Sequence, residues 1–138
     1  MRRAVLVADG CLQVEAALGA LAAAGFEAVT VSAMTEVLSH VEVGAVVVVM
    51  GLVGGSLGPD QAAAMAAMPP GFRRSCVVVL VGPQLATGDG LKAFLLGADL
   101  VVAAAHASRL GELAAAAVAA KRTLVGPLDP TAASRLGG

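Results

Sequence analysis

Apolar residues along the chain gather in short runs of strand length, separated by segments whose apolar residues have helical spacing. Five such runs predict five β-strands. They cover Ala4 to Ala8, Ala28 to Ser32, Ala45 to Met50, Cys76 to Val81 and Leu100 to Ala104. The valine-rich run GAVVVVM, which starts at Gly44, is typical of a central strand buried on both faces.

The segments between these runs predict five helices. They span Leu12 to Ala24, Thr35 to about Val41, Pro59 to Met68, Gly90 to Leu96 and Arg109 to about Leu124. Pro59 fits a first helical turn, Pro69 and Pro70 stop that helix, and Ser108 is a candidate cap for the last one. This alternation predicts an α/β fold, a doubly wound five-stranded parallel sheet with helices on both faces.

The length of 138 residues fits one domain of common size. We expect this domain to cover residues 1–124. The remaining residues, 125–138, hold two prolines, three glycines and scattered polar residues. That composition predicts a flexible tail or a linker.

Charge is sparse along the chain. Charged residues make up 14% of the sequence, against a typical share of about 25%. A partner that covers part of the surface would explain this, and so would a codon bias toward alanine, glycine and valine; both interpretations stay open. The net charge of −1 gives no electrostatic reason to expect binding to nucleic acid or to a membrane surface.

The chain begins without the pattern of a secretory signal, because Asp9 interrupts the apolar run after Arg2 and Arg3. The longest uncharged stretch, Val43 to Pro59, contains five glycines and is too short to span a membrane. The two cysteines, Cys11 and Cys76, suit a reducing compartment. We therefore expect a cytoplasmic protein.

Local motifs in order along the chain resemble the receiver domain of bacterial response regulators. They are VADG before the first helix, GFEAVTVS at the second strand, GAVVVVM followed by a glycine-rich loop, and LLGADLVVAA at the fifth strand. The resemblance covers Met1 to about Leu124. It implies a flavodoxin-like fold, and in that family the domain transfers a phosphoryl group to its own aspartate.

The residues that the family needs for this reaction are mostly missing. The resemblance places the acidic pair that holds Mg²⁺ at Ala8 and Asp9, and the phosphoacceptor at Val49 or Met50. It places the switching hydroxyl at Gly82 and the lysine at Ala104. One carboxylate is a weak anchor for Mg²⁺, and phosphoryl transfer also needs a nucleophile and groups that neutralise charge. The resemblance therefore implies a degenerate receiver that is not an enzyme and holds no metal or cofactor.

Two residues near this pocket each have two interpretations. Asp9 is either a remaining metal ligand or a carboxylate at the start of the first helix. His106 either points into the pocket or is a solvated loop residue.

Intact receivers often bind partners through the face formed by the fourth helix, the fifth strand and the fifth helix. By resemblance, the candidate interface residues of this chain are Leu91, Phe94, Leu95, Arg109, Glu112, Ala116 and Ala120. The core side of the last helix is expected at Leu110, Leu113, Ala117, Val118 and Leu124. Its many alanines would permit close approach of a partner helix, or they are there because alanine favours helix.

Two functional hypotheses follow. The first is a regulatory module of a bacterial signalling or transcription-control pathway, which acts by binding a protein partner or by dimerising, without phosphorylation. The alternative is a regulatory domain in which a small ligand occupies the uncharged pocket near Asp9, Met50, Gly82 and Ala104.

Overall fold

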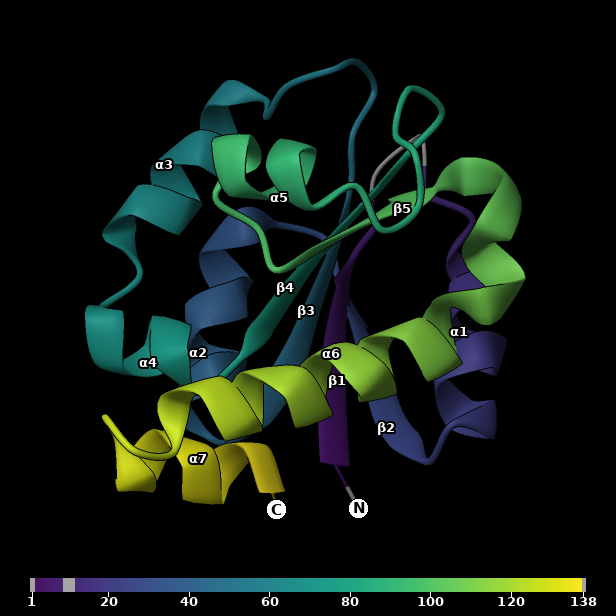
Figure 1. Cartoon of the computed structure of the whole chain (residues 1–138). Helices are drawn as coiled ribbons and strands as arrows, with labels where there is room; N and C mark the ends of the chain where they lie inside the picture. Colours follow the sequence, from purple (N-terminus) through teal and green to yellow (C-terminus); the bar gives the residue numbers. More distant parts are fainter. Residues whose placement is uncertain (1, 9–11, 138) are drawn as a thin grey trace.

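Five parallel strands form the centre of the molecule in a computed structural model that describes residues 2–8 and 12–137 (Figure 1). They pair in the order β2-β1-β3-β4-β5, all parallel. The strands are β1 Arg2–Val7, β2 Phe26–Val31, β3 Ala45–Gly51, β4 Val77–Gly82 and β5 Leu100–Ala103. The predicted α/β fold, of flavodoxin-like type, is confirmed.

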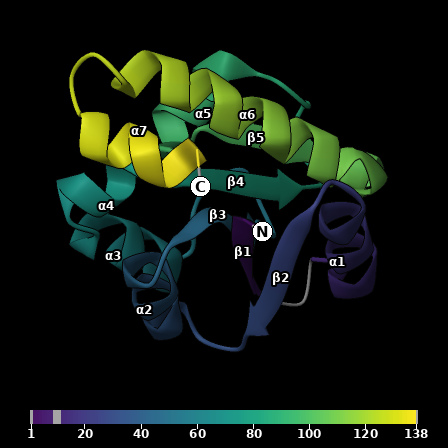
Figure 2. The same cartoon turned by 90° about the horizontal axis from the view of Figure 1, so that it is seen from below.

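Helices cover both faces of the sheet (Figure 2). The helices α1 Val14–Ala23, α6 Leu110–Val125 and α7 Pro130–Gly137 contribute to the apolar cluster on one face. The other face is covered by α2 Val37–Glu42, α3 Pro59–Ala67, α4 Pro70–Arg74 and α5 Gly90–Leu96. Two 3₁₀ helices, η1 Met34–Glu36 and η2 Ala104–Arg109, precede α2 and α6.

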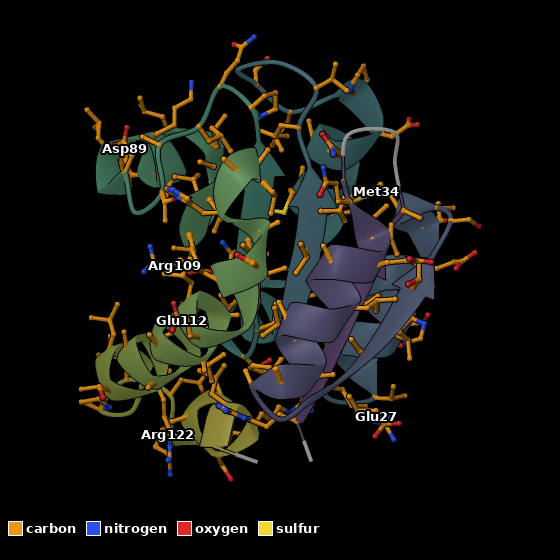
Figure 3. The ribbon with its side chains drawn as sticks, turned by 90° about the vertical axis from the view of Figure 1, so that its right-hand side faces the viewer. Glu27, Met34, Asp89, Arg109, Glu112 and Arg122 are labelled. Atoms are coloured by element: carbon orange, nitrogen blue, oxygen red, sulfur yellow. The ribbon has the colours of Figure 1, made fainter. Side chains whose placement is uncertain are left out.

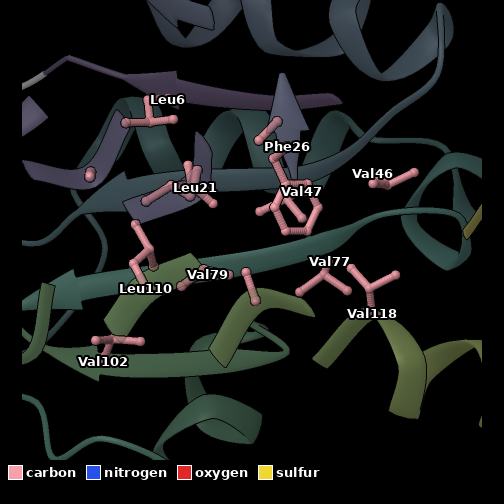
Figure 4. Close-up of a cluster of buried hydrophobic side chains, with 14 of the residues drawn as sticks. Leu6, Leu21, Phe26, Val46, Val47, Val77, Val79, Val102, Leu110 and Val118 are labelled. Carbon is pink, nitrogen blue, oxygen red and sulfur yellow. The ribbon is translucent and has the colours of Figure 1, made fainter. Parts of the chain in front are cut away.

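The valine-rich strands form the core because they are covered on both faces. Every residue of β3 and β4 is buried, whereas the edge strands β2 and β5 are only partly buried. Successive side chains of β3 point to opposite faces, so Val47 packs toward α1 and α6 while Val48 packs toward α2. Figure 4 shows the first of these clusters, in which Val47, Val79 and Leu110 meet.

The structure corrects the expected number of helices and the expected cap of the last one. The described residues form seven α-helices instead of the five expected. Pro69 and Pro70 do end α3, but Pro70 also begins α4, since proline is suited to a first helical turn. Ser108 does not cap α6, because the 3₁₀ helix η2 leads into α6 without a break.

The predicted flexible tail is instead the helix α7, which lies beside α6 in Figures 1 and 2. Ala132 and Leu136 of α7 are 3% and 0% exposed and belong to the same core cluster as α6. The guanidinium of Arg135 lies 5.6 Å from the ring centroid of Phe72 in α4. The amphipathic face of α7 thus completes the core, which a solvated tail could not do.

The docking of α7 should depend on pH through Asp129. Arg74 donates a hydrogen bond to Asp129 at 2.8 Å, and the Ala132 amide donates another at 3.1 Å. These bonds hold the pKa of Asp129 below its ordinary value of 3.8. In acid, the Asp129 carboxyl therefore takes up its proton more readily in the unfolded chain than in the folded chain. The stabilisation that these bonds give is present above pH 3.8 and is lost as the pH falls through the lowered folded pKa.

We expect Asp129→Asn to lower the free energy of unfolding above about pH 5, and to match the unaltered chain in stronger acid. Urea unfolding over a series of pH values measures the difference between the two chains. A difference that stays constant as the pH falls would contradict the assignment.

Candidate functional site

All five strands point the same way, so their carboxyl ends meet at one edge of the sheet. This edge is where open α/β sheets usually bind ligands. The backbone pairing continues just past two of the strands: the Ala8 amide donates to the Val31 carbonyl at 2.8 Å, and the Leu52 amide donates to the Val81 carbonyl at 2.8 Å. The residues at this edge are therefore held in a defined register.

At the end of β3, the two candidate phosphoacceptor positions face opposite ways. Val49 packs with Val79 in the cluster under α1 and α6. Met50 packs on the other face, and it also lines a cavity beside α3. Both side chains are 0% exposed and lack a group that could accept a phosphoryl group. Of the two positions, Met50 is the one that lines the cavity.

At the end of β4, Gly82 is closed in by the chain that follows β3. A Cβ atom on Gly82 would lie 3.0 Å from the Leu52 carbonyl oxygen and 3.3 Å from the Leu52 Cβ. Leu52 and Leu85 are themselves 1% and 5% exposed. The position that carries a hydroxyl in receivers is thus filled here by backbone and leucine side chains.

At the end of β5, Ala104 begins η2 and is half-buried. A small hydrogen-bonded network connects this end to the loop after β4. The Ala103 amide donates to the Thr87 hydroxyl at 2.8 Å, and that hydroxyl lies 2.7 Å from Nδ1 of His106. The exposed His106 ring is therefore held by Thr87, and this network joins the two loops.

Asp9, which the resemblance placed at this edge, lies outside the described residues, as does Cys11. Within residues 2–8 and 12–137, there is no group of three or more His, Cys, Asp or Glu side chains that could hold a metal ion. Ala8, the other half of the expected acidic pair, is exposed and lines the same cavity as Met50.

The cavity lies beside the strand ends, between α2 and α3, and has a volume of about 860 Å³. Two of the residues predicted for the pocket, Ala8 and Met50, line this cavity. Gly82 and Ala104 are not among the described residues that line it. Sequence analysis missed three other methionines that line it, Met34, Met65 and Met68. A usable signal was present, since Met65 and Met68 are three residues apart and so share one face of a helix.

Gln61 fixes one wall of this cavity. Its amide nitrogen donates to the Gly51 carbonyl at 2.7 Å, and its amide oxygen accepts from the Gly58 amide at 2.9 Å. Both bonds join the first turn of α3 to the two ends of the glycine-rich loop. The first turn of α3 is thereby tied to the carboxyl end of β3.

A second surface of interest lies at the edge of the sheet opposite β2, where α5 and α6 flank the edge strand β5 from the two faces of the sheet (Figure 1). Leu91, Phe94 and Leu95 of α5 are 69%, 79% and 69% exposed, as a candidate interface requires. Asp89 caps this helix by accepting a hydrogen bond from the Lys92 amide at 3.1 Å. Gly97, with φ of 73°, ends it in the left-handed conformation.

The predicted interface residues of α6 are also at the surface. Figure 3 shows Arg109, the last residue of η2, and Glu112 of α6 pointing outward, on the side of the molecule where Asp89 also lies. These two side chains pair with each other at 2.9 Å, and Ala116 and Ala120 are exposed on the same helix. The predicted core side of α6 is partly wrong: Leu124 is 74% exposed, and Ala114 is buried in its place, because the buried face runs through Leu110, Ala114 and Val118.

Near the amino ends of β4 and β5, Lys121 of α6 is held by a polar network that the sequence did not indicate. Its ammonium group donates to the carbonyls of Arg73 and Cys76, at 2.8 and 2.7 Å, and to the Asp99 carboxylate at 3.0 Å. Arg73 binds the same carboxylate at 2.7 Å. Burial lowers the pKa of Lys121, against the opposing effect of Asp99.

This network holds neighbouring elements together, and the cysteine beside it is not activated. Burial also raises the pKa of the Cys76 thiol to about 11, although Arg73 and Lys121 pull it down. A thiol with so high a pKa is almost entirely protonated at neutral pH and is a poor nucleophile. The network joins α4, β4 and α6 away from the edge where the strand ends meet.

Comparisons with known proteins leave the function open. No protein-family model matches the chain, and no curated protein matches its sequence. Among the described residues, no helix is long and apolar enough to cross a membrane. The flavodoxin-like fold therefore rests on the observed sheet order and on the helices that cover both faces.

Proposed function

We propose that this chain is a regulatory module that binds a protein through the surface of α5, without phosphoryl transfer. The observation that carries the proposal is the exposure of Phe94, at 79%, with Leu91 and Leu95 at 69% each. Positions three and four apart lie on one side of a helix, so these side chains form one apolar patch. In the simplest case, the partner is a second copy of the chain.

A patch of this kind is unusual on a surface that stays in water. Contiguous exposed apolar groups mark interaction sites, and phenylalanine is enriched at the centre of interfaces. The capping bond from Asp89 and the αL residue Gly97 define both ends of α5, so the patch is presented by an ordered helix. Pre-ordering of this kind lowers the entropic cost of association.

The residues at the strand ends support a module that works without phosphoryl transfer. Met50 cannot accept a phosphoryl group, and Gly82 and Ala104 carry neither a hydroxyl nor an ammonium. The Leu52 carbonyl also crowds the space around Gly82. Regulation through this chain would then depend on the presence of its partner and not on a phosphorylated state.

We expect the unaltered chain to dimerise with rising concentration. The double variant Leu91→Ser/Phe94→Ser should dimerise at least about 30-fold more weakly, or not at all. Removing a central aromatic anchor commonly costs about 2 kcal/mol of binding. Sedimentation equilibrium measures both affinities. The matched control is Leu124→Ser/Leu128→Ser, which removes two side chains of 74% and 86% exposure from another surface.

Two outcomes would count against the proposal. If the α5 variant associates as tightly as the control, the surface has been assigned wrongly. If acetyl phosphate and Mg²⁺ add one phosphoryl group to the intact mass of the protein, phosphorylation takes part after all. A chain that stays monomeric would exclude a second copy as the partner and restrict the proposal to a different protein.

A further inference from the structure

The cavity of about 860 Å³ beside α3 is too large to be a packing defect of an ordinary core. Val48 and Met50 of β3 line it on the sheet side, and Met65 and Met68 line it from α3 and the residue after it. Its volume falls within the range of about 300–1,000 Å³ that is typical of sites for small ligands. The cavity therefore has the size of a binding site.

The position of α3 explains why the chain does not fill this space itself. Every residue of α3 is exposed or half-buried, although α1, α2, α5 and α6 each bury side chains against the sheet. Gln61 ties its first turn to the Gly51 carbonyl at 2.7 Å. Tied at this end, the helix leaves Met65 and Met68 half-buried over the cavity.

The side chains around the cavity select for chemistry as well as size. Four of the five methionines of the chain line it, and methionine is flexible and polarisable enough to adapt to an aliphatic ligand. Ser32, Thr35 and Ser56 add hydroxyl groups. Asp60 is the charged residue among the described lining, which includes no lysine, arginine or histidine.

We propose that this cavity binds a small, uncharged, mainly aliphatic molecule that carries a hydroxyl or amide group. The apolar walls take the aliphatic part, and the serine and threonine hydroxyls can bond the polar group. An anionic head would lose its hydration without gaining a cation, and it would lie in the same cavity as Asp60. This site is separate from the α5 surface, since α5 contributes none of the described residues that line it.

The test uses the methionine methyl groups as reporters, with 1-decanol and decanoate as probes that share a chain length and differ in charge. In protein labelled with ¹³C at the methionine methyls, 1-decanol should shift the signals of Met34, Met50, Met65 and Met68 saturably, and it should raise Tm. Decanoate should bind at least tenfold more weakly. Equal or tighter binding of decanoate, or no shift with either probe, would overturn the proposal.

Two variants of α3 separate binding in the cavity from binding elsewhere. Ala64→Leu adds a side chain that fills part of the cavity, whereas Ala66→Leu adds the same side chain at an exposed position outside the described lining. We expect at least a tenfold loss of 1-decanol affinity in the first variant, with Tm unchanged or raised, and unaltered binding in the second. If Ala64→Leu binds as well as Ala66→Leu, the ligand is not in this cavity.

The same samples keep this inference distinct from the proposed function. The Leu91→Ser/Phe94→Ser variant should lose association and still bind 1-decanol. If it loses 1-decanol binding as well, the bound molecule lies on the α5 surface and the cavity is not the site.

Discussion

Replacing Gly111 with alanine is expected to lower the free energy of unfolding by about 3 kcal/mol or more, because the added methyl has no room. Gly111 lies in the first turn of α6, at the point where this helix crosses α1. A Cβ there would overlap the Ala20 carbonyl oxygen, and it would lie 2.8 Å from both the Ala20 carbonyl carbon and the Ala24 Cβ. Since two of these atoms are backbone, the helices themselves would have to move apart.

Gly19→Ala is the matched control for this substitution. Gly19 lies within α1 and is exposed, and no described atom beyond its chain neighbours and its own helix lies within 4 Å of a Cβ placed there. The higher helix propensity of alanine should therefore raise stability by about 0.5–1 kcal/mol. Urea denaturation measures both variants. If Gly111→Ala is as stable as Gly19→Ala, α1 and α6 do not cross as closely as the structure shows.

The second large effect is expected at Leu136, near the end of α7. Its side chain is 0% exposed and packs in the cluster that contains Val118 and Val125. Leu136→Ala should lower the free energy of unfolding by about 2–5 kcal/mol, through lost burial and the cavity left behind. The loss should appear in the same cooperative transition as that of the sheet, because α7 shares its core.

Leu128→Ala is the control here, since it is the same substitution eight positions earlier, at a side chain that is 86% exposed. Its effect should stay within about 0.5 kcal/mol. Equal stabilities of the two variants would mean that residues after Val125 behave as the tail that the sequence suggested. A separate early transition in Leu136→Ala alone would mean that α7 unfolds independently of the sheet.

The strands could be predicted well because their signal is local and strong. The valine runs of β3 and β4 are buried on both faces, and no competing pattern of similar length exists near them. The helix α7 was missed because Pro130 and the glycines near it suggest a loop. Yet Asp129 before Pro130 is also the pattern of a helix start, in which an aspartate caps and proline occupies the first turn.

The candidate site could be predicted only in part. The alternation of side chains along β3 puts Val49 and Met50 on opposite faces, but it does not say which face holds a cavity. That depends on how far α3 stands from the sheet, and hence on the bonds that Gln61 makes to Gly51 and Gly58. The sequence shows Gln61 but not its partners, because one of them lies ten residues away.

The exposed patch of α5 was predicted from a resemblance to a family and not from the pattern of side chains along a strand. Leu91, Phe94 and Leu95 came from the resemblance to receivers, and the structure places all three at the surface. Leu124 was assigned to the core of α6 on helical spacing alone, and it is exposed. The buried face of α6 is set instead by its crossing with α1 at Gly111, a contact between segments distant in the sequence.

The close contact between Gly82 and Leu52 decides how hard it would be to engineer phosphoryl chemistry onto this scaffold. An aspartate at Met50 and a serine at Gly82 would supply two of the missing side chains, and a carboxylate at Ala8 and a lysine at Ala104 would still be needed. The serine Cβ, however, would lie 3.0 Å from the Leu52 carbonyl oxygen, and backbone cannot rotate away as a side chain can. The backbone after β3 would therefore have to shift by a few tenths of an ångström to admit the serine, so transplanting this chemistry involves the backbone as well as the side chains.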